Sequence, residues 1–126
     1  MTRLPALLAL ALLIATPGLA EVPTYRVDTV APFTTTTTLR GASPAGHLVG
    51  ETIEAGYLEP FVATLETGLV VLPLPADAIT GIACAANSDG VIVGTVAETG
   101  LPWDQGEPAI WLPDGQGGYT VEHLEY

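Results

Sequence analysis

Residues 85–94 read AANSDGVIVG, and residues 41–50 read GASPAGHLVG. At an offset of 44 residues, which superimposes Gly46 on Gly90, each stretch has a turn-forming centre, a glycine, and an aliphatic run that ends in a second glycine. Self-similarity at a fixed spacing is typical of repeat proteins. The chain is therefore predicted to contain two copies of one structural unit.

The similarity continues downstream with a growing offset. Residues 59–62 (EPFV) match residues 107–110 (EPAI) at an offset of 48, and residues 68–71 (GLVV) match residues 118–121 (GYTV) at an offset of 50. The offset grows at two inferred loops, where insertions cost a fold least.

Short strands separated by turns are the predicted secondary structure. The 14 glycines and 11 prolines interrupt runs rich in Val, Ile, Leu and Thr, which favours strands over helices. The predicted strands cover residues 36–43, 47–53, 61–65 and 69–72 in the first unit, and 79–86, 91–97, 109–112 and 119–124 in the second. Four antiparallel strands in about 40–50 residues match the scale of one propeller blade. The predicted fold is all-β, with two open, blade-like meander units over about 36–72 and 79–124.

The turn between the first two strands of each unit has a physical explanation. In the second unit Asn87 offers a side-chain oxygen to nearby backbone N–H groups, and Gly90 can adopt a left-handed conformation. Gly46 is expected to do the same in the first unit, and Gly50 and Gly94 are expected at matching positions in the strands that follow.

The first 20 residues have the three parts of a secretory signal peptide. Arg3 supplies positive charge, residues 4–15 form an apolar run, and small residues precede the bond between Ala20 and Glu21. The apolar run is shorter than the roughly 20 residues that a membrane-spanning helix needs. We expect cleavage after residue 20, export to the periplasm or the medium, and no membrane attachment afterwards.

Residues 21–126 are strongly acidic. All 14 acidic residues lie there against two arginines, Arg26 and Arg40, so the formal charge of this segment is −12. Such a surface repels phosphate backbones, and a nucleic-acid partner is not expected.

Few residues have side chains that suggest catalysis. His47 follows the first turn and is expected to face solvent, and His123 is expected to point away from the core. The serines, Ser43 and Ser88, lie in turns and outside any Gly-x-Ser-x-Gly motif. The lone cysteine, Cys84, stands in an apolar stretch and is expected to be buried. The sequence predicts a protein that is not an enzyme and has no metal or cofactor.

The stretch over residues 98–107 is the candidate ligand-contact loop. Asp104 and Glu107 could contribute oxygen ligands to Ca²⁺, although the spacing of a calcium loop is missing. Alternatively, Trp103 could offer a stacking face to a sugar or a peptide. Trp111 lies within a predicted strand and is expected in the core.

Residues 86–94 (ANSDGVIVG) resemble the core of the bacterial extracellular HAF repeat, which pairs an Ile-Asn turn and a glycine with a Val-Val-Gly strand. Residues 108–115 (PAIWLPDG) look like its second block, in which a His-Ala-Phe triplet precedes an aromatic strand and a glycine turn. Pro60 and Pro108 replace the histidine of that triplet. The resemblance spans nearly all of residues 21–126 and implies an exported repeat protein, with no catalytic or ligand-binding residue to transfer.

Residues 25–30 (YRVDTV) resemble residues 119–124 (YTVEHL), which predicts an initial strand over residues 25–33 equivalent to the last strand of a unit. Both terminal strands would present unpaired backbone groups, so self-association through these edges is expected. The leading functional hypothesis is an exported, non-catalytic binding or structural module whose ligand or protein partner is unknown. The alternative is a truncated remnant of a larger exported β-propeller enzyme or sensor.

Overall fold

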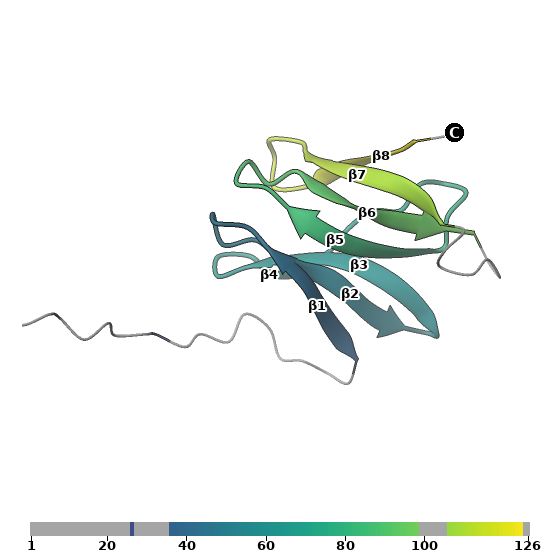
Figure 1. Cartoon of the computed structure of the whole chain (residues 1–126), viewed down its shortest axis with the longest axis horizontal. Coiled ribbons are helices and arrows are strands. Elements are labelled where there is room, and N and C mark those ends of the chain that lie inside the picture. The colour runs from purple at the N-terminus through teal and green to yellow at the C-terminus, as the bar shows by residue number, and fades with distance from the viewer. Residues whose placement is uncertain (1–25, 27–35, 99–105, 125–126) are drawn as a thin grey trace, which may run out of the picture.

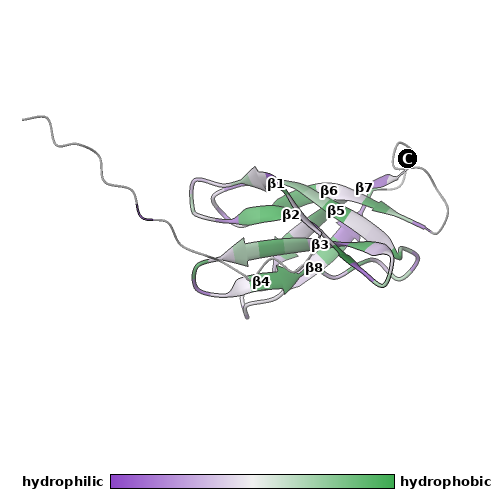
Figure 2. Ribbon diagram, turned by 90° about the horizontal axis from the view of Figure 1, so that it is seen from below, coloured by the Kyte–Doolittle hydropathy of each residue, from purple (hydrophilic) through white to green (hydrophobic). Residues whose placement is uncertain are grey.

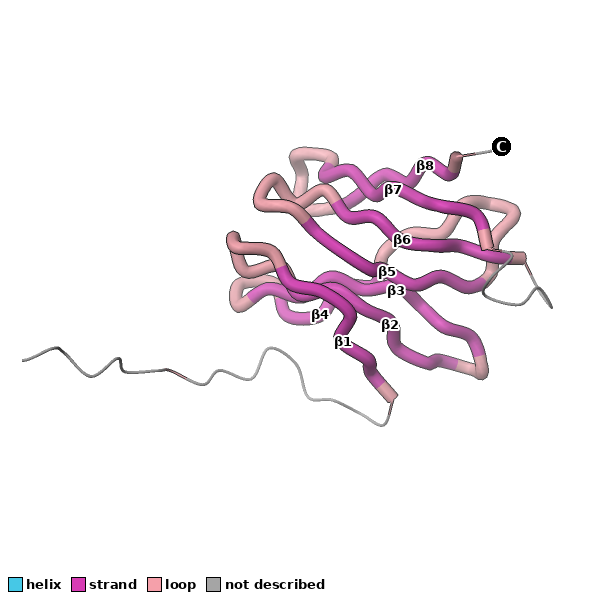
Figure 3. The backbone as a smooth tube through the Cα atoms, viewed as in Figure 1, coloured by secondary structure: helices cyan, strands magenta, loops and turns pink. Residues whose placement is uncertain are grey.

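The computed structural model describes residues 26, 36–98 and 106–124. These residues form eight strands and no helix, and so include no helix able to cross a membrane (Figures 1 and 3). The strands are β1 (Thr37–Ala42), β2 (Leu48–Glu54), β3 (Tyr57–Thr64), β4 (Gly68–Val71), β5 (Thr80–Ala86), β6 (Ile92–Ala97), β7 (Glu107–Pro113) and β8 (Tyr119–His123). The expected signal peptide, residues 1–20, lies outside the described residues. So does the expected initial strand, except for Arg26, which is exposed and in no strand.

The strands form two separate four-stranded sheets. Their orders are β1-β2-β3-β4 and β5-β6-β7-β8, and every pairing is antiparallel between chain neighbours. Each sheet is therefore an open meander with two edge strands. The predicted all-β class with two antiparallel four-stranded sheets is confirmed at this level.

The same irregularity marks the first hairpin of each sheet. The register of β1 against β2 shifts between Leu39 and Gly41, and that of β5 against β6 shifts between Ala83 and Ala85. The two shifts lie 44 residues apart, which is the offset between the aligned sequences. A β-bulge bends and twists a strand locally, so both sheets curve at the same place.

A glycine faces each bulge because the neighbouring strand comes too close for a side chain. A Cβ atom on Gly50 would lie 1.9 Å from the carbonyl oxygen of Thr38, and one on Gly94 would lie 1.9 Å from that of Ile82. Only glycine can allow this approach. The two glycines thus occupy equivalent positions for the same steric reason.

In the last hairpin, the offset between equivalent residues of the two sheets differs by two residues from the offset in the sequence alignment. In the first sheet Thr64 pairs with Gly68, and in the second Leu112 pairs with Thr120. The offset is therefore 48 in the third strand but 52 in the fourth, where the alignment predicted 50. Two of the four extra residues lengthen the turn, which covers residues 114–118 against 65–67 in the first sheet, and two extend the strands by the pair Pro113 and Tyr119. A two-residue shift keeps each side chain on its side of the sheet.

The register assigns each side chain to one of two faces. We call face A the side that carries Val49 and Val62 in the first sheet and their equivalents Val93 and Ile110 in the second. Face B is the opposite side. Figure 2 shows hydrophobic residues along the strands of both sheets, with hydrophilic residues mostly at the turns.

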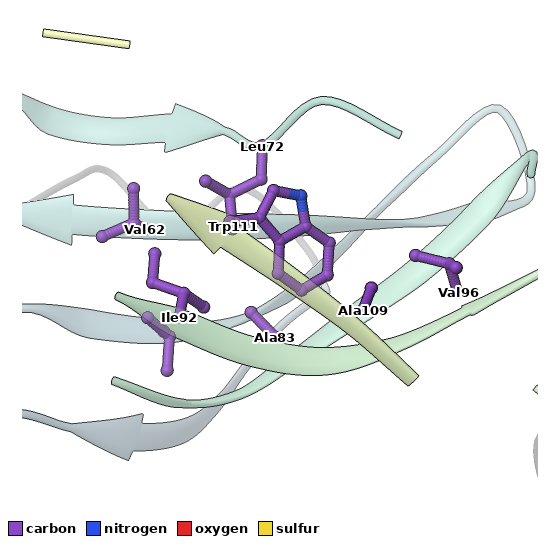
Figure 4. Packing of buried hydrophobic residues seen from close by; sticks show 8 residues of the cluster. Val62, Leu72, Ala83, Ile92, Val96, Ala109 and Trp111 are labelled. Carbon is purple, nitrogen blue, oxygen red and sulfur yellow. The ribbon is translucent and has the colours of Figure 1, made fainter. Parts of the chain in front are cut away.

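One hydrophobic core joins the two sheets. Face A of the first sheet contributes Val49 and Val62, together with Leu72 just after β4. Face B of the second sheet contributes Ala83, Ile92, Val96, Ala109 and Trp111, and Figure 4 shows these side chains gathered around the indole ring. The sheets therefore pack through non-equivalent faces, head to tail, with β5 lying against β1, β2 and β3.

Trp111 is the largest buried side chain of the core. It is fully buried, and its Nε1 donates a hydrogen bond of 2.7 Å to the carbonyl oxygen of Pro73. Pro73 belongs to the connector over residues 72–79, which joins the two sheets. The indole thus satisfies its polar atom while it fills the space between the sheets.

Candidate functional site

Three titratable side chains meet at one corner of the second sheet. They come from the connector (Asp77), the first residue of β7 (Glu107) and the last residue of β8 (His123). His123 Nδ1 lies 2.6 Å from Glu107 Oε2, and His123 Nε2 lies 3.9 Å from Asp77 Oδ2. We call this group the Asp77–Glu107–His123 cluster.

The position of His123 differs from the sequence-based prediction. It was expected to point away from the core, but it lies on face B with Val121, and its side chain is 22% exposed. Residues two apart in a strand share a face, so a histidine two residues after a core-facing valine also points toward the first sheet.

The cluster is best described as a hydrogen-bonded contact between Glu107 and His123 with Asp77 nearby. Imidazole nitrogen and carboxylate oxygen are donors that Zn²⁺ accepts, and one such atom from each residue lies within 4.8 Å of the others. However, Glu107 bonds directly to an imidazole nitrogen, and both carboxylate side chains are about half exposed. The contacts connect β7, β8 and the connector, and no independent feature indicates a metal.

Of the three candidate ligand-contact residues, Glu107 alone lies within the described residues, because Trp103 and Asp104 lie outside them. Its carboxylate contacts His123. The calcium and stacking hypotheses for the loop therefore remain predictions.

Ser43 and His47 form a contact that the sequence did not reveal. Ser43 Oγ lies 2.8 Å from His47 Nδ1, which is the distance between a nucleophile and its base in many hydrolases. Ser43 is buried, and His47, which was expected to face solvent, is half-buried. A Cβ atom on Gly90 would lie 3.3 Å from His47 Nε2, so the ring packs against the turn of the second sheet.

Comparison with the first hairpin of the second sheet indicates that Ser43 has a structural role. Ser43 Oγ accepts the backbone N–H of His47 at 3.2 Å, and Asn87 Oδ1 accepts the backbone N–H of Val91 at 3.0 Å. Serine and asparagine thus close equivalent turns by the same hydrogen bond. Within residues 36–98 and 106–124, no hydrogen bond joins His47 to a carboxylate that could orient it as a base.

The glycines of these turns are also equivalent. Gly46 has φ of 91° and Gly90 has φ of 79°, both in the left-handed region that favours glycine. Beside the first turn, an open hollow is lined by Ala45, Gly46, His47, Thr64, Leu65 and Glu66. These residues belong to two turns at the end of the sheet, so the hollow is not an enclosed pocket.

Cys84 is exposed, so the prediction of a buried thiol is wrong. It occupies the bulge of the edge strand β5, where its carbonyl oxygen approaches Gly41 of β1. An apolar neighbourhood in sequence does not establish burial, because a residue of an edge strand can remain exposed.

The residue of the first sheet that is equivalent to Cys84 is Arg40, which forms an ion pair with Glu51. Arg40 Nη2 lies 2.6 Å from Glu51 Oε1, and Arg40 Nε lies 2.9 Å from Glu51 Oε2. The Glu51 side chain is 5% exposed, whereas that of Arg40 is 48% exposed. The hydrogen bond to Glu51 raises the pKa of the Arg40 guanidinium above its ordinary value. The equivalents of Arg40 and Glu51 in the second sheet, Cys84 and Thr95, are uncharged at neutral pH.

Comparison with protein-family models, curated proteins and solved structures finds no match to this chain.

Proposed function

We propose that the protein is an exported, non-catalytic module of two blade-like repeat units, which acts outside the cytoplasm by binding a partner or as a structural element. The head-to-tail packing of two equivalent sheets is the observation that carries this proposal. Successive blades of a propeller are repeated four-stranded sheets arranged in this sense around an axis. The secretory pattern of residues 1–20 and the resemblance to the HAF repeat support export.

The chemistry of the described residues supports a binding role over catalysis. The Ser43–His47 contact closes a turn, His123 lies between two carboxylates, and Cys84 is exposed in the edge strand β5. A triad-type hydrolase needs a nucleophile, a base and a group that orients the base, brought together in a cleft. The loop that contains Trp103 remains the candidate contact for a ligand or a protein partner.

The alternative is a remnant of a larger exported propeller enzyme or sensor. The edge strands β1, β4, β5 and β8 favour it, because a complete propeller leaves only short, protected edges. An independent module is expected to be folded and soluble on its own, whereas a remnant is expected to aggregate.

Expression of the full chain in a bacterial host tests the proposal. Mass spectrometry of the exported fraction should find a chain that begins at Glu21, and Leu8→Arg within the apolar run should prevent export. Recovery of intact Met1 from the cytosol alone would contradict export. A hydrolytic activity that disappears in both Ser43→Ala and His47→Ala variants with normal circular dichroism would contradict the non-catalytic role.

A further inference from the structure

The edge strands of the two sheets differ in how they are protected against pairing with another chain. β1 and β5 each carry a bulge, and β8 carries Glu122 and the titratable His123. Bulges and charged side chains are among the features that keep an edge from accepting a further strand. β4, at the edge of the first sheet (Figure 2), reads GLVV, with no charge and no proline, and pairs with β3 without a register shift. It is therefore the edge best suited to accept a strand.

The register shows which backbone groups of β4 point outward. The N–H of Leu72 donates to the carbonyl oxygen of Pro60, and bonded pairs recur every second residue in an antiparallel ladder. Leu69 and Val71 are therefore the residues whose N–H and C=O groups point away from β3. Within residues 36–98 and 106–124, no hydrogen bond reaches these groups. Val71 is 45% exposed and Leu69 is half-buried, so solvent reaches this edge.

Both ends of β4 are held in place by the fold. At its start, the N–H of Thr67 donates to Thr64 Oγ1 at 3.1 Å, and the two hydroxyl oxygens lie 2.8 Å apart. At its end, Leu72 is 2% exposed and belongs to the core. An edge that is already ordered loses little conformational entropy on binding, so backbone pairing can contribute to affinity.

The charge of the chain indicates which partner this edge would accept. Residues 21–126 have a formal charge of −12 and no lysine, and Arg40 is paired with Glu51. Glu66, in the turn that leads into β4, is exposed, and no ion pair involves it in the part of the chain that the structure describes. Such a surface attracts a basic partner and repels an acidic one, including a second copy of this chain.

We propose that the β4 edge binds an extended, basic peptide segment of a partner protein by strand addition. The segment bonds to the outward N–H and C=O groups of Leu69 and Val71 as a fifth strand of the first sheet. A lysine or arginine at the end nearest the β3–β4 turn pairs with the Glu66 carboxylate. In such complexes the backbone bonds give affinity and the side chains beside the strand give specificity. The inference names a partner chemistry for the binding role proposed above, but it uses neither export nor the Trp103 loop and can fail without them.

A labelled peptide provides the probe. Fluorescence anisotropy measures the binding of fluorescein-labelled KTVTVTK to the full chain, with ETVTVTE as the acidic counterpart. The basic peptide should bind with a Kd below about 1 mM and about tenfold more tightly than the acidic one. Its affinity should fall as salt is added, because salt screens the attraction to exposed carboxylates. Equal binding of the two peptides, or no binding of KTVTVTK in this range, would overturn the inference.

Leu69→Pro tests the backbone contact. Proline cannot donate a hydrogen bond, and at an outward position of an edge strand it leaves the ladder intact. Thr37→Pro is the matched control in β1, because Thr36 accepts the N–H of Ile53 and Thr37 therefore points outward, as Leu69 does. L69P should weaken the binding of KTVTVTK about tenfold with unchanged circular dichroism, and T37P should not. Unchanged binding by L69P, or an equal loss in both variants, would contradict pairing at β4.

Glu66→Lys tests the charge and leaves the strand unaltered. It should reverse the preference, so that ETVTVTE binds more tightly than KTVTVTK. Glu122→Lys is the control, because Glu122 is exposed on the second sheet and its replacement changes the net charge equally. An equal effect of the two variants would overturn the role of Glu66. A wild-type dimer in light scattering that L69P abolishes would assign the β4 edge to a second copy and would also overturn the inference.

Discussion

Replacement of Trp111 is the most direct test of how the two sheets are held together. Its indole ring is fully buried between the sheets, and its Nε1 hydrogen bond to Pro73 connects β7 to the connector. Trp111→Ala removes the ring and the hydrogen bond together. Trp111→Phe keeps most of the apolar volume and removes the hydrogen bond, so the two variants separate the contributions of packing and polar contact.

The expected losses follow from the burial of the ring and from the loss of one hydrogen bond. Truncation of a buried tryptophan to alanine costs about 3–5 kcal/mol of unfolding free energy. Loss of the hydrogen bond to Pro73 costs about 1 kcal/mol, the typical net contribution of one hydrogen bond. A small domain has about 5–15 kcal/mol in total, so Trp111→Ala should bring the chain close to unfolding at room temperature.

Urea denaturation followed by far-ultraviolet circular dichroism measures these losses, at a protein concentration low enough to keep the chain monomeric. Leu112→Ala is the control, since Leu112 is the next residue of β7, points to the opposite face and is half-buried. A loss below about 1 kcal/mol for Trp111→Ala would refute the account of the core. Equal losses for Trp111→Ala and Trp111→Phe would show that the hydrogen bond, and not packing, holds the sheets together.

Three further changes test the repeat and its electrostatics. Gly50→Ala and Gly94→Ala should each cost about 2–3 kcal/mol of unfolding free energy, because a Cβ atom at either site meets a backbone carbonyl oxygen; a tolerated alanine at one site alone would contradict their equivalence. Arg40→Met should cost about 2 kcal/mol because it leaves the buried Glu51 carboxylate without its partner, whereas the double change R40C/E51T, which copies the second sheet, should recover most of that stability in the same urea titration. The pKa of Glu59 is raised above its ordinary value of 4.5. Burial is the largest cause, and repulsion from a neighbouring carboxylate is the second. The protonated form therefore favours the fold below that value, and this contribution is lost as the pH rises through the raised pKa. Glu59→Gln should be more stable than the wild type at neutral pH and should lose this pH dependence, and an unchanged stability profile would contradict the assignment.

The strand pattern could be predicted from sequence because the relevant forces are local. Glycine and proline end the apolar runs, and each predicted strand overlaps one observed strand, from β1 at Thr37–Ala42 to β8 at Tyr119–His123. The equivalent positions of the paired glycines could be predicted for the same reason. A left-handed φ at Gly90 and the close approach of backbone at Gly94 are requirements on one or two residues.

The candidate site was less predictable because its residues meet through the sheet register and the connector. Asp77, Glu107 and His123 are far apart in sequence, and the β7–β8 pairing brings the last two together. The repeat offset in β8 is two residues larger than the alignment predicted, so the register could not be derived from the motif alone. The Ser43–His47 contact had a local indication, because the two residues stand four apart across a turn. The equivalent residues of the second unit, Asn87 and Val91, are not a serine and a histidine.

The sequence by itself determined that this protein is made of two short-stranded β units with the same first turn, since conformational limits on glycine and alternation along a strand act within a few residues. Only the tertiary structure decided which side of each sheet is covered. Apolar residues line both faces, so their pattern cannot say that face A of the first sheet meets face B of the second. That choice buries Trp111 between the two sheets, whereas Cys84 in the edge strand β5 is exposed.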